Sequence, residues 1–324
     1  MPTSDNNSLQ RSYLAVPGNA VRFFEKAAKS AADAIFLDLE DAVAPPDKDN
    51  ARATVIEALN HIDWGNKAMT VRINTLQSPY MFRDVIDLLS HCPRLDYLLI
   101  PKVNQAQDLY AVETLINQVE LATDRPRRIG LEAMIETAEG LCNVEEIARA
   151  GSRLQALHFG SGDFAASIAS RTTGIGMAHP GYRITQHGRS HLNDMWHYAQ
   201  MRIVVACRAY GLRPIDGPYG DYSDAGGSTE AAERAAILGY EGKQAIHPSQ
   251  IEAINAVFSP TAAEILQATR IIAAMQQAQA QHRGAVALDG KLLDLVSIRL
   301  ADNILGKARK IGLPIPELDR DTPL

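Results

Sequence analysis

The sequence predicts an α/β protein built on a closed (β/α)8 TIM barrel, followed by a C-terminal helical extension. Eight short apolar runs alternate with stretches that have the spacing of amphipathic helices. Near-continuous apolar strands that alternate with helices indicate a parallel sheet covered on both faces. Eight such units are typical of a closed barrel rather than of an open sheet.

The elements follow one another regularly in the first part of the chain. Between most of the strands lie helical stretches, at residues 20–32, 48–61, 106–121, 144–150 and 230–239. An open dinucleotide-binding sheet is disfavoured because no G-x-G-x-x-G follows the first strand. The predicted strands are residues 13–16, 34–39, 69–73, 97–100, 130–135, 154–159, 212–215 and 243–246.

Two segments depart from the repeat. Residues 172–213 form a long insertion, which we expect to be an irregular loop that becomes helical from about residue 193 to 210. Residues 260–281 and 292–311 have helical spacing, and a glycine-rich turn or hairpin joins them. We therefore expect three parts: a disordered tail (1–10), a catalytic barrel (11–258) and a helical extension (259–324) that serves as a lid or oligomer contact.

Composition narrows the classes of function. The formal net charge of −6 argues against a nucleic-acid partner, which needs a basic face. No apolar run reaches the length of a membrane span, and the polar N-terminal residues do not have the pattern of a secretory signal. The cysteines, Cys92, Cys142 and Cys207, are widely spaced and odd in number. A cytoplasmic protein with reduced thiols and no membrane partner is expected.

Polar residues follow seven of the eight predicted strands at their carboxyl ends, which is where barrel enzymes carry their catalytic groups. This alignment predicts an enzyme. The groups are Asp38, Glu40 and Asp41, then Arg72, Lys102, Glu136, Asp163, Asp216 and His247.

The residue types favour a metal-assisted reaction. There is no G-x-S-x-G, H-E-x-x-H or cysteine nucleophile motif. Glu136 and Asp163 follow neighbouring strands, and two carboxylates can hold Mg²⁺ while waters and substrate oxygens complete its octahedron. The alternative for either residue is a helix cap or a salt bridge.

Three further side chains each have two interpretations. Arg72 lies in an apolar strand and needs an anion, which is either Asp38 or Glu40 or a substrate carboxylate or oxyanion. Lys102 is either a Schiff-base lysine or, as we favour, a charge-balancing group. His247 is either an acid/base group or structural.

Several segments together resemble a known family over residues 11–310. The segments RSYLAVPGN (11–19), FLDLEDAVAPPDKDNAR (36–52), VRIN (71–74), PKV (101–103), IETAEG (135–140), FGSGDFAAS (159–167) and KQAIHP (243–248) resemble the citrate lyase β-subunit-like branch of the HpcH/HpaI aldolases. Within that branch, TTGIG (172–176) and ACRAYGLRPIDGPYGDYSD (206–224) resemble the L-malyl-CoA/β-methylmalyl-CoA lyases.

The resemblance implies an activity and an assembly. It implies an oxo-acid-lyase dependent on Mg²⁺, with Mn²⁺ as the alternative ion, that reversibly cleaves L-malyl-CoA or β-methylmalyl-CoA to glyoxylate and acetyl-CoA or propionyl-CoA. It also implies a homotrimer or homohexamer. The alternatives are a malyl-CoA thioesterase and a lyase for citramalyl-CoA or citryl-CoA. A non-catalytic acyl-CoA-binding barrel is disfavoured, because it would not need Glu136, Asp163 and Arg72 together.

The resemblance also implies roles for individual residues. Glu136 and Asp163 would bind the metal, and Arg72 would contact the substrate. A C-terminal lid, often supplied by a neighbouring subunit, would carry Asp294 as the proton-transfer group; from the residues alone, the favoured interpretation of Asp294 is a charge on a helix surface. The acyl part of the site would be lined by Gly162, Asp163, Ile246 and His247, and the CoA phosphates would be met by Lys26 with Arg11 or Arg22.

The chain departs from the malyl-CoA lyase pattern at two positions near these basic residues. It has Ala15 where those lyases often have an aromatic residue, and Ala20 where they often have an arginine.

Overall fold

The structure, a computed structural model, describes residues 9–123, 125 and 127–317, which fall into two compact units that divide between Phe258 and Ser259. Most of the expected N-terminal tail lies outside the described residues. Of its two described residues, Gln10 is buried. Each unit is considered by itself.

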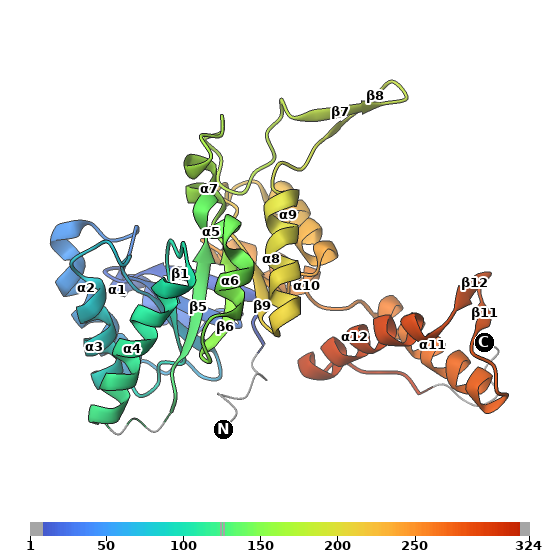
Figure 1. Cartoon of the computed structure of the whole chain (residues 1–324), viewed down its shortest axis with the longest axis horizontal. Coiled ribbons are helices and arrows are strands. Elements are labelled where there is room, and N and C mark those ends of the chain that lie inside the picture. Colours follow the sequence, from blue (N-terminus) through green and yellow to red (C-terminus); the bar gives the residue numbers. More distant parts are fainter. Residues whose placement is uncertain (1–8, 124, 126, 318–324) are drawn as a thin grey trace. The chain divides into compact units, whose positions relative to one another are not determined.

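Eight of the described strands close into a parallel barrel in the first unit (Figure 1). Closure results from the pairing of β1 with both β2 and β10. Each strand overlaps one predicted from the sequence, so the predicted barrel is confirmed. The strands are β1 (Ser12–Pro17), β2 (Ala34–Asp38), β3 (Ala68–Arg72), β4 (Tyr97–Ile100), β5 (Gly130–Ile135), β6 (Leu154–Phe159), β9 (Arg213–Asp216) and β10 (Gly242–Ala245).

Helices surround the barrel and bury its outer face. The helix α3 was not predicted, although its buried residues Val85, Leu88 and Leu89 have helical spacing; α9 begins five residues earlier than predicted. The helices are α1 (Val21–Ala28), α2 (Lys48–His61), α3 (Met81–His91), α4 (Ala106–Thr123), α5 (Ala138–Cys142), α6 (Val144–Arg149), α7 (Ser161–Ser167), α8 (His197–Tyr210), α9 (Ala225–Leu238) and α10 (Ile251–Val257), with short 3₁₀ turns at Pro45–Asp47 and Pro248–Gln250.

Alternation along the strands separates two kinds of interior. Residues such as Leu14 and Ile35 point outward and pack against the helices in the main hydrophobic core. Their neighbours Tyr13, Ala34 and Phe36 point inward and belong to a smaller cluster inside the barrel. This inner space also holds polar side chains, and it opens into the cavity described below.

The insertion after β6 contains an antiparallel hairpin, β7 (Arg183–Gln186) with β8 (Arg189–Leu192), which extends beyond α7 and α8 (Figure 1). The prediction of an irregular loop is wrong for this part. His187 and Gly188 form its turn, both with positive φ (49° and 73°), as a two-residue hairpin turn requires. The strands are exposed throughout and lack apolar alternation, so the usual strand signal is missing.

The second unit is a helical pair closed by a small hairpin. Helices α11 (Ala262–Ala280) and α12 (Leu295–Ile311) pack through small and branched residues, including Ala268, Ala301 and Leu305. Between them, β11 (Val286–Leu288) pairs with β12 (Lys291–Leu293), as the glycine-rich connection predicted. No helix in the described part of the chain is long and apolar enough to cross a membrane.

Candidate active site

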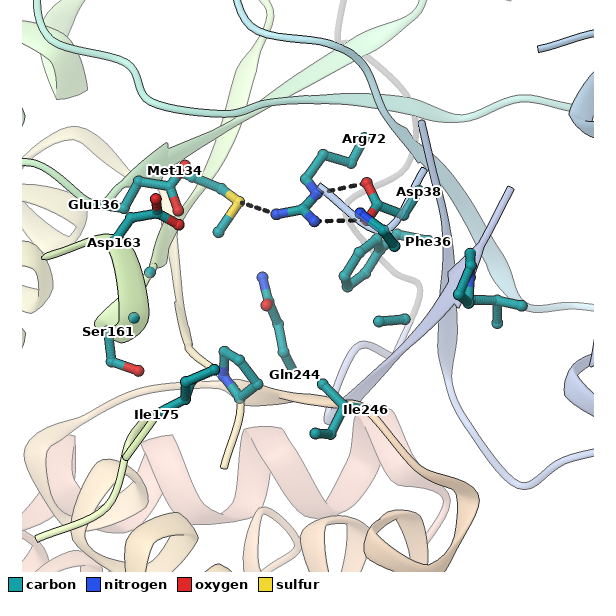
Figure 2. A pocket seen from close by; sticks show the side chains of 17 residues that line it. Phe36, Asp38, Arg72, Met134, Glu136, Ser161, Asp163, Ile175, Gln244 and Ile246 are labelled. Atoms are coloured by element: carbon teal, nitrogen blue, oxygen red, sulfur yellow. Dashed lines mark hydrogen bonds and ion pairs between the residues drawn. The ribbon is translucent and has the colours of Figure 1, made fainter. Parts of the chain in front are cut away.

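A cavity of about 300 Å³ lies at the carboxyl ends of the barrel strands. It brings together five residues predicted for the site: Arg72 from β3, Glu136 after β5, Gly162 and Asp163 from α7, and Ile246 after β10. Figure 2 shows Glu136 and Asp163 side by side, with Arg72 across from them. The barrel thus converts residues far apart in sequence into one site.

Glu136 is a buried carboxylate, 1% exposed, at the end of β5. Its Oε1 accepts a hydrogen bond from the backbone N–H of Lys102, with N and O 2.7 Å apart. Gly160 leaves room for it, because a Cβ there would lie only 2.2 Å from Glu136 Oε2. Burial raises the pKa of Glu136 to about 8, and the charge of Asp163 adds to the increase although that of Arg72 opposes it.

Lys102 shapes this corner of the site through both its backbone and its side chain. Its φ of 51° is unusual for a residue with a side chain, and in this conformation its N–H reaches Glu136. Its ammonium is hydrogen-bonded to Glu40 and lies 3.8 Å from Asp163 Oδ1. Burial lowers the pKa of Lys102, but Glu40 outweighs burial and holds the pKa above its ordinary value. A lysine held charged is a poor nucleophile, which favours the charge-balancing role over a Schiff base.

Arg72 is held by carboxylates and still faces the cavity. Its Nε and Nη2 donate to the two oxygens of Asp38 at 2.7 and 2.6 Å, and Nη1 lies 3.3 Å from Glu40 Oε2. This bidentate pair supplies the anion that a buried arginine needs. Burial lowers the pKa of Arg72, but Asp38 outweighs it, so the guanidinium stays charged. The interpretation of Arg72 as part of an ion pair therefore holds. Because Arg72 also lines the cavity, its contact with a substrate carboxylate or oxyanion stays a prediction.

Glu136 and Asp163 fit a divalent cation of the magnesium type. No group of three or more His, Cys, Asp or Glu side chains among the described residues could hold a metal ion. Mg²⁺ commonly takes only one or two protein carboxylates and fills its other positions with water or substrate. The side chain of Asp163 is 41% exposed, which leaves space for such ligands. A cation between the two carboxylates would also relieve the repulsion that raises the pKa of Glu136.

The remaining predicted contacts fall in different places. His247 is exposed and does not line the cavity; it stacks on Tyr222, with ring centroids 4.6 Å apart, and caps the turn that follows it. Arg22 and Lys26 are exposed on α1, which begins four residues after the cavity-lining Pro17. A phosphate-bearing ligand at the cavity mouth could meet this pair.

The structure does not bring Arg11 to the cavity. Arg11 precedes β1, at the end of the barrel opposite the cavity, roughly 20 Å of strand away from Pro17. Its backbone N–H and its guanidinium both donate to Asp33, at 2.9 and 2.7 Å. In this position it ties β1 to the start of β2.

Asp294 belongs to the second unit, where it is exposed and caps α12. Its Oδ1 accepts hydrogen bonds from the N–H groups of Val296 and Ser297, at 2.8 and 3.3 Å. The residue has the local structure of a helix N-cap, and its role in proton transfer stays a prediction.

Phe36, Met134 and Gln244 also line the cavity and were not predicted. Each lies two residues before a polar or predicted site residue: Asp38, Glu136 and Ile246. Side chains two apart on a strand share a face, so this spacing could have identified them.

Three known proteins are similar to this chain over almost its whole length. An L-malyl-CoA/β-methylmalyl-CoA lyase of Rhodobacter capsulatus is 49% identical over 93% of this chain and 95% of its own. A (3S)-malyl-CoA thioesterase of Cereibacter sphaeroides is 37% identical over the same shares. The solved structure of CitE from Mycobacterium tuberculosis, in complex with magnesium, acetoacetate and coenzyme A, superposes with a TM-score of 0.73. It is 26% identical and covers 94% of this chain and 99% of its own.

The model of one family matches residues 11–248, which include the whole barrel and every cavity residue named above. The chain belongs to the HpcH/HpaI aldolase/citrate lyase family.

Proposed function

We propose that the protein is a Mg²⁺-dependent carbon–carbon lyase. It would reversibly cleave L-malyl-CoA or β-methylmalyl-CoA to glyoxylate and acetyl-CoA or propionyl-CoA. The observation that carries the proposal is the meeting of Glu136, Asp163 and Arg72 at one cavity. The substrate class is supported by the 49% identity to a lyase of that name.

Glu136 and Asp163 would hold the cation, which when bound supplies a Lewis acid for the oxygens of the 2-oxo acid. Arg72, kept charged and oriented by Asp38, would bind the carboxylate of that half. The buried, preorganised guanidinium would need no reorientation as charge develops, which lowers the barrier.

The bond changes balance without a redox partner. The substrate hydroxyl gives up its proton to water, and the bond between the carbinol carbon and the carbon alpha to the thioester breaks. Its electron pair forms the enolate of the acyl-CoA, and a proton returns to that carbon. We assign this proton to Asp294, on the resemblance of its segment to the family. Arg22 and Lys26, exposed on α1, are the proposed partners of the CoA phosphates.

The test is a product assay with purified protein and L-malyl-CoA. With Mg²⁺ we expect acetyl-CoA and glyoxylate, and with excess EDTA no cleavage; Mn²⁺ tests the second ion. The same assay defines the preferred acyl group when it is repeated with β-methylmalyl-CoA, citramalyl-CoA and citryl-CoA. Intact thioesters in every arm would reject the lyase.

The second candidate is a malyl-CoA thioesterase, because a relative of that name is 37% identical. It would attack the thioester with water in the same cavity and release malate and free CoA. Release of malate instead of glyoxylate would identify the protein as a thioesterase.

A further inference from the structure

Gln244 enters the cavity from β10, away from the metal-binding carboxylates. It is 3% exposed and lines the cavity together with Ile246, which lies two residues further on and on the same face of the chain. Figure 2 shows its carboxamide directed toward Arg72, into the space between Met134 and Phe36. In the barrel order, β9 and β6 lie between β10 and β5. Gln244 therefore faces a part of the cavity that the metal pair does not occupy.

The carboxamide contacts a fully buried histidine, which in turn lies next to a fully buried glutamate. Gln244 Nε2 lies 3.1 Å from His158 Nδ1, and His158 Nε2 lies 3.2 Å from Glu132 Oε2. Both His158 and Glu132 are 0% exposed. Burial raises the pKa of Glu132, but His158, Arg213 and Tyr13 outweigh burial and lower it, so the carboxylate is ionised.

The carboxamide of Gln244 lies with its amino group toward His158. An amide nitrogen carries two hydrogens, and the contact with Nδ1 can use only one of them. The second hydrogen is left for a group in the cavity.

We propose that Gln244 contacts the thioester carbonyl oxygen of the acyl-CoA, and that His158 and Glu132 are positioning residues that act through it. The proposal rests on the proposed lyase function. With the 2-oxo acid at Glu136, Asp163 and Arg72, the acyl part must occupy the remaining space, where Gln244 and Ile246 lie. Negative charge develops on the thioester oxygen as the enolate forms, and a preorganised N–H stabilises it.

The first test is Gln244→Met, which keeps the length of the side chain and removes its hydrogen bonds. We expect kcat for malyl-CoA cleavage to fall about 100-fold, with much less change in KM. The control is Thr70→Val: Thr70 is buried in the same barrel, and its Oγ1 has no hydrogen-bond partner among the described residues. We expect its kcat to stay within about twofold of wild type. An unchanged kcat in Gln244→Met, or a change confined to KM, overturns the contact.

The second test compares His158→Asn with His158→Leu. The two replacements have similar shape, and both lose the contact with Glu132, but only asparagine keeps an acceptor near the position of Nδ1. We expect His158→Leu to have a kcat roughly tenfold below His158→Asn, and this difference to vanish when each is combined with Gln244→Met. A difference that persists in the presence of Gln244→Met, or no difference at all, overturns the positioning role.

Two measurements separate this inference from the proposed function. Wild-type protein that fails to cleave any malyl thioester rejects both. Active wild type with an unaffected Gln244→Met rejects the inference alone. Mg²⁺ affinity by calorimetry should be the same in Gln244→Met and wild type, because Gln244 is not a proposed ligand; a lost affinity would instead mean a collapsed site and overturn the proposal.

Discussion

Glu136 is placed where a carboxylate is costly to the fold. It is 1% exposed and lies beside another acid, and the hydrogen bond from the N–H of Lys102 does not compensate for burial. A cation shared with Asp163 would recover part of that cost. We therefore expect Glu136 to lower the stability of the metal-free protein and to contribute affinity for a metal.

The pH dependence of stability tests this trade in Glu136→Gln. The pKa of Glu136 is about 8 in the folded protein against an ordinary value of 4.5. Between these pH values the folded chain holds a proton that the unfolded chain has lost, so stability falls as pH rises through this window. Glutamine does not titrate. In EDTA, we expect the variant to unfold a few degrees above wild type at pH 8, with little difference near pH 4.5.

Thermal unfolding followed by circular dichroism at several pH values measures this difference, and calorimetry should find that the variant no longer binds Mg²⁺. A stability difference that does not change with pH would contradict the raised pKa.

Asp294 can be tested without loss of its helix cap. Asparagine is as good an N-cap as aspartate, so Asp294→Asn should keep the hydrogen bonds to Val296 and Ser297. It cannot carry the proton. We expect kcat to fall by about 10²-fold or more, with unchanged unfolding temperature and Mg²⁺ affinity. Wild-type turnover in this variant would remove Asp294 from the mechanism.

At the scale of elements, the junction of β6 and α7 positions Glu136 and Asp163, the proposed metal ligands. Gly160 lies between the strand and the helix, and Asp163 is in the first turn of that helix. A Cβ at Gly160 would lie 2.2 Å from Glu136 Oε2 and 2.4 Å from its Cβ, whereas a Cβ at Gly162 would meet Ile175 at an ordinary 3.5 Å. The strands β5 and β6 can therefore lie this close only because residue 160 is a glycine, which has no side chain.

A matched pair of alanine variants tests this junction. We expect Gly160→Ala to lower the free energy of unfolding by about 1–3 kcal/mol, as overpacking does, and to weaken Mg²⁺ binding by displacing Glu136. Gly162→Ala should stay within about 0.5 kcal/mol of wild type, because alanine also favours the helix. Chemical denaturation gives the free energies. Equal effects of the two substitutions would show that the contact with Glu136 is not the cause.

At the scale of the whole molecule, the second unit exposes apolar side chains that a stable protein would cover. Leu292, Leu295, Val296 and Leu300 are 77%, 60%, 50% and 60% exposed around the start of α12. An apolar patch of this kind marks an interaction surface. Together with the trimers or hexamers expected from the family resemblance, it suggests a subunit contact.

Light scattering tests the assembly. We expect a mass of three or six chains of 35.3 kDa, and a lower mass for the double variant Leu295→Asp/Leu300→Asp. Leu121→Asp is the control, because Leu121 is 86% exposed on α4 and lies outside the patch. A monomeric wild type, or an unchanged mass in the double variant, would reject this surface as the contact.

Prediction from the sequence succeeded where the signal is local and periodic. The eight strands, the hairpin before α12 and the polar residues at the carboxyl strand ends all follow from apolar runs and turn residues. It failed at the exposed hairpin after β6, which has no apolar alternation, and it missed α3, although the buried residues Val85, Leu88 and Leu89 have helical spacing.

By itself, the sequence determined the barrel and identified Glu136, Asp163 and Arg72 as candidate site residues, because a parallel barrel gathers every carboxyl strand end at one rim. Only the tertiary structure decided how these groups are held. Asp38 pairs with Arg72 across adjacent strands, Gly160 admits Glu136, and His158 lies between Gln244 and Glu132. Such contacts join residues from different strands, and their strength depends on burial and distance, which no local pattern encodes.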